Sequence, residues 1–570
     1  MSEQDVVSDE SVLSQALGIA EDPLAKVDPI GLGRSLAKAM VSTARHPKVP
    51  LEASARFTNG VIQSSVAVSS RLLGTKVHGP VSPEPKDRRF GDVAWSDNGV
   101  FFGILQAYLL TDRLVTDLVE GAEVAQPAAA KARFAARLLL DAMSPTNFLL
   151  TNPQAIRRAF ETGGVSLLRG AQHFLNDVAS NGGWPSQVDT SPFKLGENMA
   201  ATAGRVVFRN DLIELIQYEP QTPQVHGIPM LFCPPWINKY YIMDLAPGKS
   251  LIEWAVQHGL TAFAISYRNP DSSMRDVTFD DYLFEGPRAA VDAVRSITGA
   301  AKVNTLAVCL GGTLNTVLLA YLNAIGEDLV HTSTYLNALT DFSDAGTLKA
   351  TFTDPQTVEG LAKRMEAKGY LDAADMARTF DLLRARDLVF NYVASNWLMG
   401  EDPPAFDLLA WNADGTRMPA KMHAYYLRRC WIDNALARDA MDVQGTPLLV
   451  SKVPNDTYIV AAIDDHIVPW QANYRTTQLL NGNCRFVLSS SGHIAGIVNP
   501  PSPKCRLWLN EKIPPTADAW LEGSTQHHET WWNDWLTWVL PRSGPLGSPP
   551  SMGNPEFPAG ARAPGTYVYG

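Results

Sequence analysis

Short apolar runs that alternate with helix-like stretches dominate the chain from about residue 201 onward. Two such runs are Pro229-Met230-Leu231-Phe232-Cys233 and Thr261-Ala262-Phe263-Ala264-Ile265-Ser266. Each has the length and composition of a strand, and longer segments with helical character lie between them. This alternation predicts an α/β fold with a parallel sheet flanked by helices. The pattern stops near residue 340 and resumes at Pro447-Leu448-Leu449-Val450.

The N-terminal part of the chain has a different pattern. Residues 1–30 are polar and acidic, which predicts a flexible N-terminus. Residues 31–200 are mostly helical in character. In the Ala/Leu-rich run from Ala128 to Met143, Arg133 and Arg137 are four apart and share one side, as in an amphipathic helix. We therefore predict a helical N-terminal domain over 31–200, ahead of an α/β core over 201–340 and 446–540.

Two further segments interrupt or follow that core. Residues 341–445 are helical, charged and aromatic, and they contain Pro403-Pro404; we predict that they form an inserted cap. Residues 541–570 are rich in Pro, Gly and Ser, which predicts an extended tail. Just before this tail, Trp531, Trp535 and Trp538 fall on one face of a predicted helix. We expect that face to pack on the core; contact with a lipid-like or polymer surface is the alternative.

The most informative residue is Cys309, in Leu306-Ala307-Val308-Cys309-Leu310-Gly311-Gly312-Thr313. An apolar run leads in, two glycines follow, and an apolar run of helical composition leads out. This is the layout of a nucleophile elbow, a sharp strand-to-helix turn that raises a nucleophile above an α/β-hydrolase sheet. An isolated Cys after an apolar strand is more often a small buried hydrophobic residue, so the motif needs partners elsewhere in the chain.

Two later strand ends supply those partners. Thr457 to Ile463 is β-rich and ends at Asp464-Asp465, and Arg485 to Ser489 leads into a loop that carries His493. The order nucleophile, acid, histidine is that of the α/β-hydrolase fold. The acid lies 156 residues after Cys309 and 28 before His493, a first gap long enough for the cap. Asp residues also cap turns, and the residues alone leave Asp464 and Asp465 as alternatives.

Composition narrows the compartment and the classes of partner. The chain has 570 residues and a net charge of −11, which argues against a broad nucleic-acid surface. The acidic start lacks the features of a secretory signal, and we find no apolar stretch long enough for a transmembrane segment. The cysteines are scattered and odd in number, without metal-ligand spacing or a disulfide framework: Cys233, Cys309, Cys430, Cys484 and Cys505. We expect a cytoplasmic protein with reduced thiols and no metal.

From about residue 80 to its end, the chain resembles the polyhydroxyalkanoate synthases, class I-like, which polymerise 3-hydroxyacyl-CoA thioesters into storage polyester. Besides the Cys309 segment, the residues that carry the resemblance are Phe208 to Ile216, Pro234-Pro235-Trp236-Ile237-Asn238-Lys239-Tyr240-Tyr241, Tyr267-Arg268-Asn269-Pro270, Asp465-His466-Ile467-Val468-Pro469-Trp470, Ser491-Gly492-His493-Ile494-Ala495-Gly496, and Pro564-Gly565-Thr566-Tyr567-Val568. The chain departs from the family at Ala307, where Gly is usual; one added methyl group should be tolerated.

The resemblance implies roles for particular residues. Cys309 is the acyl-carrying nucleophile, His493 the base and Asp465 its partner, which selects Asp465 over Asp464. The N–H of Leu310, directly after the nucleophile, is the first expected oxyanion donor. The second should come from the loop after Cys233, at Ile237 or Trp236.

Four residues are candidates for substrate contact: Trp236, whose ring could narrow the acyl pocket, Lys239, Arg268 and His466. Lys239 and Arg268 could instead form structural ion pairs.

The same resemblance implies partners and a location. We expect 3-hydroxyacyl-CoA as substrate, CoA as its leaving group and no cofactor. The growing polyester and the granule surface, granule-coat proteins and a second copy of the chain in a homodimer are expected partners. The protein should be cytoplasmic and associated with granules. A thiol esterase or acyltransferase of the same fold is the alternative enzyme, and a noncatalytic granule-coat subunit is the alternative from another class.

Overall fold

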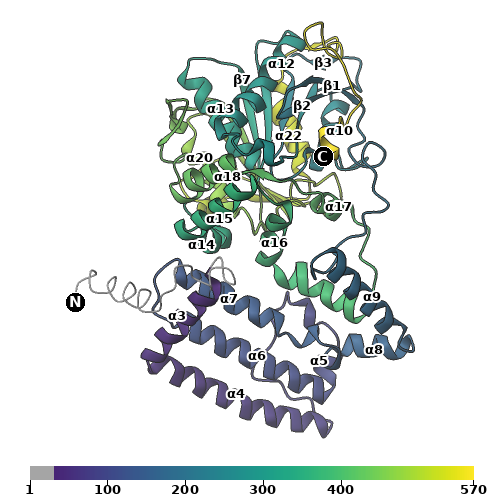
Figure 1. Cartoon of the computed structure of the whole chain (residues 1–570), viewed down its shortest axis with the longest axis vertical. Coiled ribbons are helices and arrows are strands. Elements are labelled where there is room, and N and C mark those ends of the chain that lie inside the picture. The colour runs from purple at the N-terminus through teal and green to yellow at the C-terminus, as the bar shows by residue number, and fades with distance from the viewer. Residues whose placement is uncertain (1–30) are drawn as a thin grey trace, which may run out of the picture. The chain divides into compact units, whose positions relative to one another are not determined.

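The computed structural model describes residues 31–570, so the predicted flexible segment 1–30 lies outside the described residues. The described chain divides into two compact units (Figure 1). One holds the residues up to Gln172 together with 350–360 and 393–400, and the other holds the rest. Along residues 31–570, no helix combines the length and apolar character that a membrane crossing needs.

The first unit is helical. Its elements are α3 (Leu32–Arg45), α4 (Lys48–Leu72), η1 (Arg88–Phe90), α5 (Ala94–Asp97), α6 (Gly99–Glu120), α7 (Ala128–Ala142), α8 (Pro153–Glu161) and the start of α9 (Val165–Ser180). Helix α4 packs along α6, and α3 packs along α7 (Figure 1). Gly60 permits the first contact, because a Cβ at this position would lie 2.4 Å from Leu110 Cδ2. The predicted helix at Ala128–Met143 is confirmed as α7.

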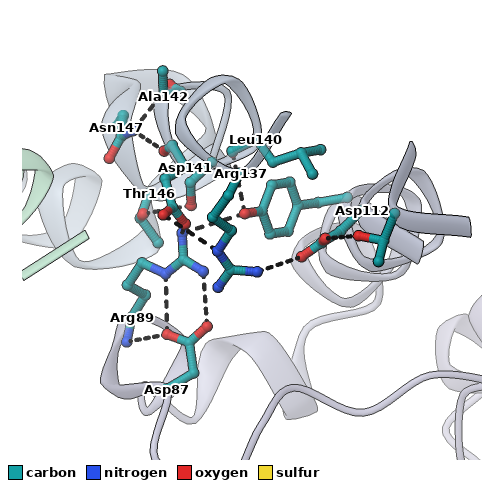
Figure 2. A network of polar contacts seen from close by, with 12 residues as sticks. Asp87, Arg89, Asp112, Arg137, Leu140, Asp141, Ala142, Thr146 and Asn147 are labelled. Carbon is teal, nitrogen blue, oxygen red and sulfur yellow. Dashed lines mark hydrogen bonds and ion pairs between the residues drawn. The ribbon is translucent and has the colours of Figure 1, made fainter. Parts of the chain in front are cut away.

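A buried ionic network joins η1 to α6 and α7 (Figure 2). The Arg89 guanidinium donates to both carboxylate oxygens of Asp87, at 3.0 and 2.8 Å, and to Asp141 Oδ1 at 3.2 Å. The Arg89 side chain is only 11% exposed. Asp141 also pairs with Arg137, and burial raises the pKa of its carboxyl group. A buried charge is tolerated only when it is paired. Arg89 also donates to Tyr108 Oη on α6 at 3.3 Å, so it links η1 to both α6 and α7.

The second unit is built on a ten-stranded sheet in the order β1-β2-β5-β4-β6-β7-β12-β13-β14-β15. The strands are β1 (Gly204–Arg209), β2 (Ile213–Tyr218), β4 (Met230–Cys233), β5 (Ala262–Tyr267), β6 (Val303–Val308), β7 (Val330–Leu336), β12 (Asp456–Ala462), β13 (Cys484–Ser489), β14 (Leu507–Leu509) and β15 (Thr525–His527). From β5 to β13 neighbouring strands are parallel, but β1, β2, β14 and β15 pair antiparallel. The sheet is therefore mixed rather than wholly parallel, and the predicted α/β-hydrolase arrangement is confirmed.

Helices lie between the strands of this sheet and after its last strand. They are α10 (Leu251–Gln257), α11 (Phe279–Leu283), α12 (Ala289–Thr298), α13 (Leu310–Ala324), α19 (Trp470–Tyr474), α20 (Thr476–Leu479), α21 (Ala517–Glu522) and α22 (Trp531–Val539). The chain returns from β5 across β4 to β6, so the strand order reverses beside β6. In open α/β sheets, ligands bind outside the carboxyl ends of the strands at such a switch point.

The sheet is interrupted between β7 and β12. This insertion contains α14 (Gly346–Phe352), α15 (Pro355–Lys368), α16 (Ala373–Leu383), α17 (Asp407–Ala413) and α18 (Ala420–Tyr426), with the short strands β8 (Tyr370–Leu371), β9 (Met418–Pro419), β10 (Met441–Val443) and β11 (Thr446–Leu448). The sequence predicted that the main sheet resumes at Pro447, which is wrong. Gln444 and Gly445 both have positive φ, as a tight hairpin turn requires, so β11 pairs locally with β10 and the sheet resumes at β12.

The last part of the chain is packed against the sheet of the second unit. Trp531 and Trp535 in α22 are fully buried and Trp538 is 9% exposed, so the expectation that this helix packs on the core is confirmed. Beyond it, β16 (Leu546–Gly547) pairs with β3 (Val225–His226). Residues near 561 then run along β1, with Val206 N–H donating to Ala561 O at 2.8 Å. The tail thus extends the edge of the sheet.

Candidate active site

The turn between β6 and α13 places Cys309 at the carboxyl end of a central strand. Cys309 has φ 50° and ψ −119°, a backbone conformation that residues with a Cβ rarely adopt. Strained backbone conformations of this kind cluster at functional sites. Its N–H donates to Leu336 O on β7 at 2.9 Å, and its carbonyl accepts from Gly312 N–H at 2.9 Å. These bonds hold the strained turn, and the thiol remains partly exposed.

The two glycines after Cys309 are required by close packing. A Cβ at Gly311 would lie 2.4 Å from Cys233 O, and one at Gly312 would lie 2.3 Å from Ala338 Cβ. Larger residues would push the start of α13 away from the loop after β4 or from the segment after β7. Ala307, the departure from the usual glycine, is completely buried within β6.

Asp465 and His493 lie in contact after β12 and β13. His493 Nδ1 lies 2.6 Å from Asp465 Oδ2. Asp465 Oδ1 accepts from the backbone N–H groups of Ile467 and Val468, at 2.8 and 2.9 Å. The Asp465 carboxylate is fully buried, whereas the neighbouring Asp464 is exposed. The structure therefore places Asp465, not Asp464, against the imidazole.

The imidazole is electrostatically coupled to both the acid and the thiol. Burial alone would lower the pKa of His493, but the Asp465 carboxylate and a side-chain hydrogen bond with Cys309 outweigh it and raise this pKa to about 10. A base with a raised pKa accepts a thiol proton readily, which favours the thiolate form of the nucleophile. Because Nδ1 faces Asp465, Nε2 is the nitrogen left for this exchange.

Asn337 is a residue of the site that the sequence reasoning missed. It follows β7 directly, has φ 46°, and its amide Nδ2 donates to the backbone carbonyl of His493. It thus supports the loop that carries the base. Asn337 follows the strand that lies between the strands of Cys309 and Asp465. This position in the sequence could have identified it as a residue of the site.

The N–H of Leu310, directly after the nucleophile, and the N–H of Ile237, in the loop after β4, are the two groups that the sequence analysis expects to stabilise an oxyanion. Among the described residues, neither the Leu310 N–H nor the Ile237 N–H has a hydrogen-bond acceptor. The loop that carries Ile237 lies against the start of α13, since a Cβ at Gly311 would also contact Pro234 O at 2.6 Å. Preorganised backbone donors of this kind stabilise the oxyanion of acyl transfer.

The four candidate substrate residues lie in different surroundings. Trp236 is 1% exposed and packs edge-on against Tyr426, with ring centroids 5.3 Å apart. Tyr426, which the sequence analysis did not single out, interacts electrostatically with Cys309. His466 is half-buried, and burial first, then the charge on Arg384, lower its pKa to about 4. It is therefore neutral near pH 7.

The two basic candidates are engaged in ion pairs. Lys239 is buried and binds Asp414 Oδ1 at 2.8 Å. Arg268 is one-third exposed and donates to Asp271 Oδ2 at 2.9 Å. Both observations agree with the structural ion pairs that the sequence analysis kept as the alternative.

Comparison with known proteins points to one family. The model described as the N-terminus of poly-beta-hydroxybutyrate polymerase (PhaC) matches residues 86–255, and the alpha/beta hydrolase fold model matches 225–500. The chain is 40% identical to the poly(3-hydroxyalkanoate) polymerase of Methylorubrum extorquens, over 94% of this chain and 89% of that protein. It is 41% identical to polymerase 1 of Ectopseudomonas oleovorans, over 86% of this chain and 87% of that protein. With the polymerase subunit PhaC of Cupriavidus necator, identity is 41% over 85% and 83% of the two chains.

Proposed function

Since this chain belongs to the poly(3-hydroxyalkanoate) polymerases, which are acyltransferases, we propose that it polymerises (R)-3-hydroxyacyl-CoA through an acyl thioester on Cys309, with release of CoA. The observation that carries the proposal is the strained Cys309 turn, whose thiol is coupled to the His493–Asp465 pair. A noncatalytic subunit would need no such arrangement.

Acylation begins with transfer of the Cys309 proton to His493 Nε2. The thiolate attacks the thioester carbonyl, and the Leu310 and Ile237 N–H groups stabilise the oxyanion. The bond to the CoA sulfur then breaks, and the CoA sulfur takes the proton from the imidazolium. The 3-hydroxyacyl group remains on Cys309 as a thioester.

Chain transfer uses the same residues in a second half-reaction. His493 takes the proton of an incoming hydroxyl group, whose oxygen attacks an acyl thioester; the ester forms, the carbon–sulfur bond breaks, and the proton returns to sulfur. Asp465 fixes the imidazole tautomer and stabilises the imidazolium. Both Asp465 oxygens already hold protein N–H groups, which supports this indirect role over direct activation of the hydroxyl.

A cysteine nucleophile suits this reaction energetically. The enzyme-bound thioester keeps the acyl group about as activated as it was on CoA. An ester on serine would hold the group at the energy of the ester product and would weaken the drive for transfer to an alcohol. The free energy of ester formation is therefore released in the chain-transfer step, where it drives the transfer.

Other parts of the proposal concern substrate and location. Trp236 limits the acyl pocket, which favours short monomers such as 3-hydroxybutyryl, and His466 contacts substrate as a neutral hydrogen-bonding group. Residues 341–445 act as a cap over the site. The helical N-terminal domain contributes to granule association and to a homodimer, and the protein works in the cytoplasm at the granule surface with granule-coat proteins.

Product analysis separates the polymerase from the alternative enzyme. Purified protein and Cys309→Ala are given (R)-3-hydroxybutyryl-CoA, CoA release is followed, and the insoluble product is analysed. We expect CoA release with polyester, both absent in the variant. CoA release with free 3-hydroxy acid alone would indicate a thiol esterase instead. Polyester made by Cys309→Ala would remove Cys309 from the mechanism.

A further inference from the structure

The ammonium group of Lys239 is buried, and each of its N–H donors has a partner. Its ammonium donates to Val568 O at 2.5 Å and Gly570 O at 3.1 Å, and pairs with Asp414 Oδ1 at 2.8 Å. An ammonium group has three N–H donors, so all three are engaged. Lys239 thereby connects three segments that are far apart in sequence: the loop after β4, the segment after α17, and residues 566–570.

The end of α17 and the segment after it also bind the carbonyl groups of this loop. Thr416 Oγ1 donates to Trp236 O at 2.9 Å, and Thr416 N–H donates to Ile237 O at 3.3 Å. Trp411 Nε1 donates to Lys239 O at 2.8 Å. The carbonyl groups of three loop residues are therefore held by one short stretch of the insertion.

Residues 566–570 are anchored independently of Lys239. The buried Glu214 carboxylate accepts from the N–H groups of Thr566 and Tyr567, at 2.7 and 3.0 Å. Asn269 Nδ2 donates to Gly570 O at 3.0 Å. This segment is thus a fixed point against which the Lys239 side chain can hold the loop.

The geometry of the peptide bond links these contacts to chemistry. The Ile237 N–H and the Trp236 carbonyl belong to one planar trans peptide, so they point in opposite directions. The Thr416 hydroxyl, by holding Trp236 O, fixes the Ile237 N–H to point away from Thr416. A rotation of this peptide would replace the oxyanion donor by a carbonyl oxygen.

We propose that Thr416 and Lys239 are positioning residues that fix the Trp236–Ile237 peptide so that its N–H is directed at the oxyanion of acyl transfer. The inference rests on the proposed function, because Ile237 acts only if Cys309 is acylated. It gives the insertion and the last residues of the chain a part in catalysis without contact with substrate.

The test compares two reactions of the same thiol. Acylation by hydroxyacyl-CoA passes through an oxyanion, whereas alkylation by iodoacetamide forms a carbon–sulfur bond with loss of iodide and needs no oxyanion donor. Single-turnover CoA release and the alkylation rate at the Cys309 peptide, read by mass spectrometry, are measured for Thr416→Val and Lys239→Met. Thr457→Val is the matched control, since its buried hydroxyl also donates to a backbone carbonyl at 2.9 Å, away from the loop.

We expect CoA release to fall roughly 10- to 100-fold in Thr416→Val and Lys239→Met, as loss of an oxyanion donor costs on the order of 100-fold or more. Alkylation should stay unchanged, and Thr457→Val should change neither rate. The inference is overturned if CoA release in Thr416→Val matches Thr457→Val, or if alkylation falls in parallel with CoA release, which would indicate damage to the thiol or the fold. Absence of CoA release from the unmodified protein would instead remove the proposed function.

Discussion

Asp465→Asn isolates the contribution of the buried carboxylate to the reaction. The change keeps the side-chain shape, and Oδ1 can still accept from Ile467 and Val468. The other end of the side chain becomes an NH₂ donor 2.6 Å from His493 Nδ1. The imidazole must then accept at Nδ1 and carry its proton on Nε2, where it cannot take a proton from Cys309.

The size of the expected loss of activity follows from the changed tautomer of His493 and from the loss of the Asp465 charge. In a triad, substitution of the acid by its amide lowers kcat by about 10⁴-fold. The pKa of His493 should fall from about 10, because burial, which lowers it, is then no longer opposed by the carboxylate. The thiolate fraction of Cys309 near pH 7 falls with it.

Two assays read these effects, with Asp464→Asn as the control because Asp464 is the exposed neighbour. CoA release gives kcat, and the pH dependence of Cys309 alkylation by iodoacetamide reports the thiolate. Asp465→Asn should lose both CoA release and alkylation at neutral pH, whereas Asp464→Asn should behave as the unmodified protein. If Asp465→Asn retained kcat within about tenfold, the role assigned to the carboxylate would be refuted.

Three further predictions concern packing, the helical unit and pH. Gly311→Ala should destabilise the fold by roughly 1–3 kcal/mol by overpacking against Cys233 O and lower CoA release, as denaturant unfolding and kcat will show; full activity would contradict the packing argument. Arg89→Met should lower the free energy of unfolding of the helical unit by about 3–5 kcal/mol, since it removes the cation that pairs with two buried carboxylates, whereas Lys76→Met, at an exposed pair, should have little effect on stability; equal losses of stability in the two variants would contradict the importance of the Arg89 network. The raised pKa of His493 stabilises the folded state fully below pH 6.5 and progressively less up to about pH 10, so the stability of the unmodified protein relative to His493→Gln should decline over that interval; a constant or rising difference would oppose this assignment.

Much of the site could be predicted because its residues follow strands. An apolar run ending in Cys309-Leu310-Gly311-Gly312 has one common structural meaning, and acidic and histidine residues after later strands complete it. The carboxyl ends of parallel strands meet at one edge of the sheet, so sequence order becomes spatial proximity. The choice of Asp465 over Asp464 depended on resemblance, since burial cannot be read from two adjacent identical residues.

Contacts between distant segments could not be predicted. Lys239 looked like a ligand for an anionic substrate because its partners, Asp414 and the carbonyls of Val568 and Gly570, are more than 170 residues away in the chain. The antiparallel edges of the sheet were missed for a similar reason: apolar runs indicate strands but not the direction of their neighbours. Likewise, the pattern near Pro447 did not reveal that a turn would pair β11 with β10.

The most direct measurement is the mass of the Cys309-containing peptide after rapid acid quench of the enzyme with (R)-3-hydroxybutyryl-CoA. The mechanism predicts a 3-hydroxyacyl adduct on Cys309 that hydroxylamine removes, with longer adducts as elongation proceeds, and no adduct in Cys309→Ala. CoA release and polyester formation with no acyl group on Cys309 at any time would contradict it.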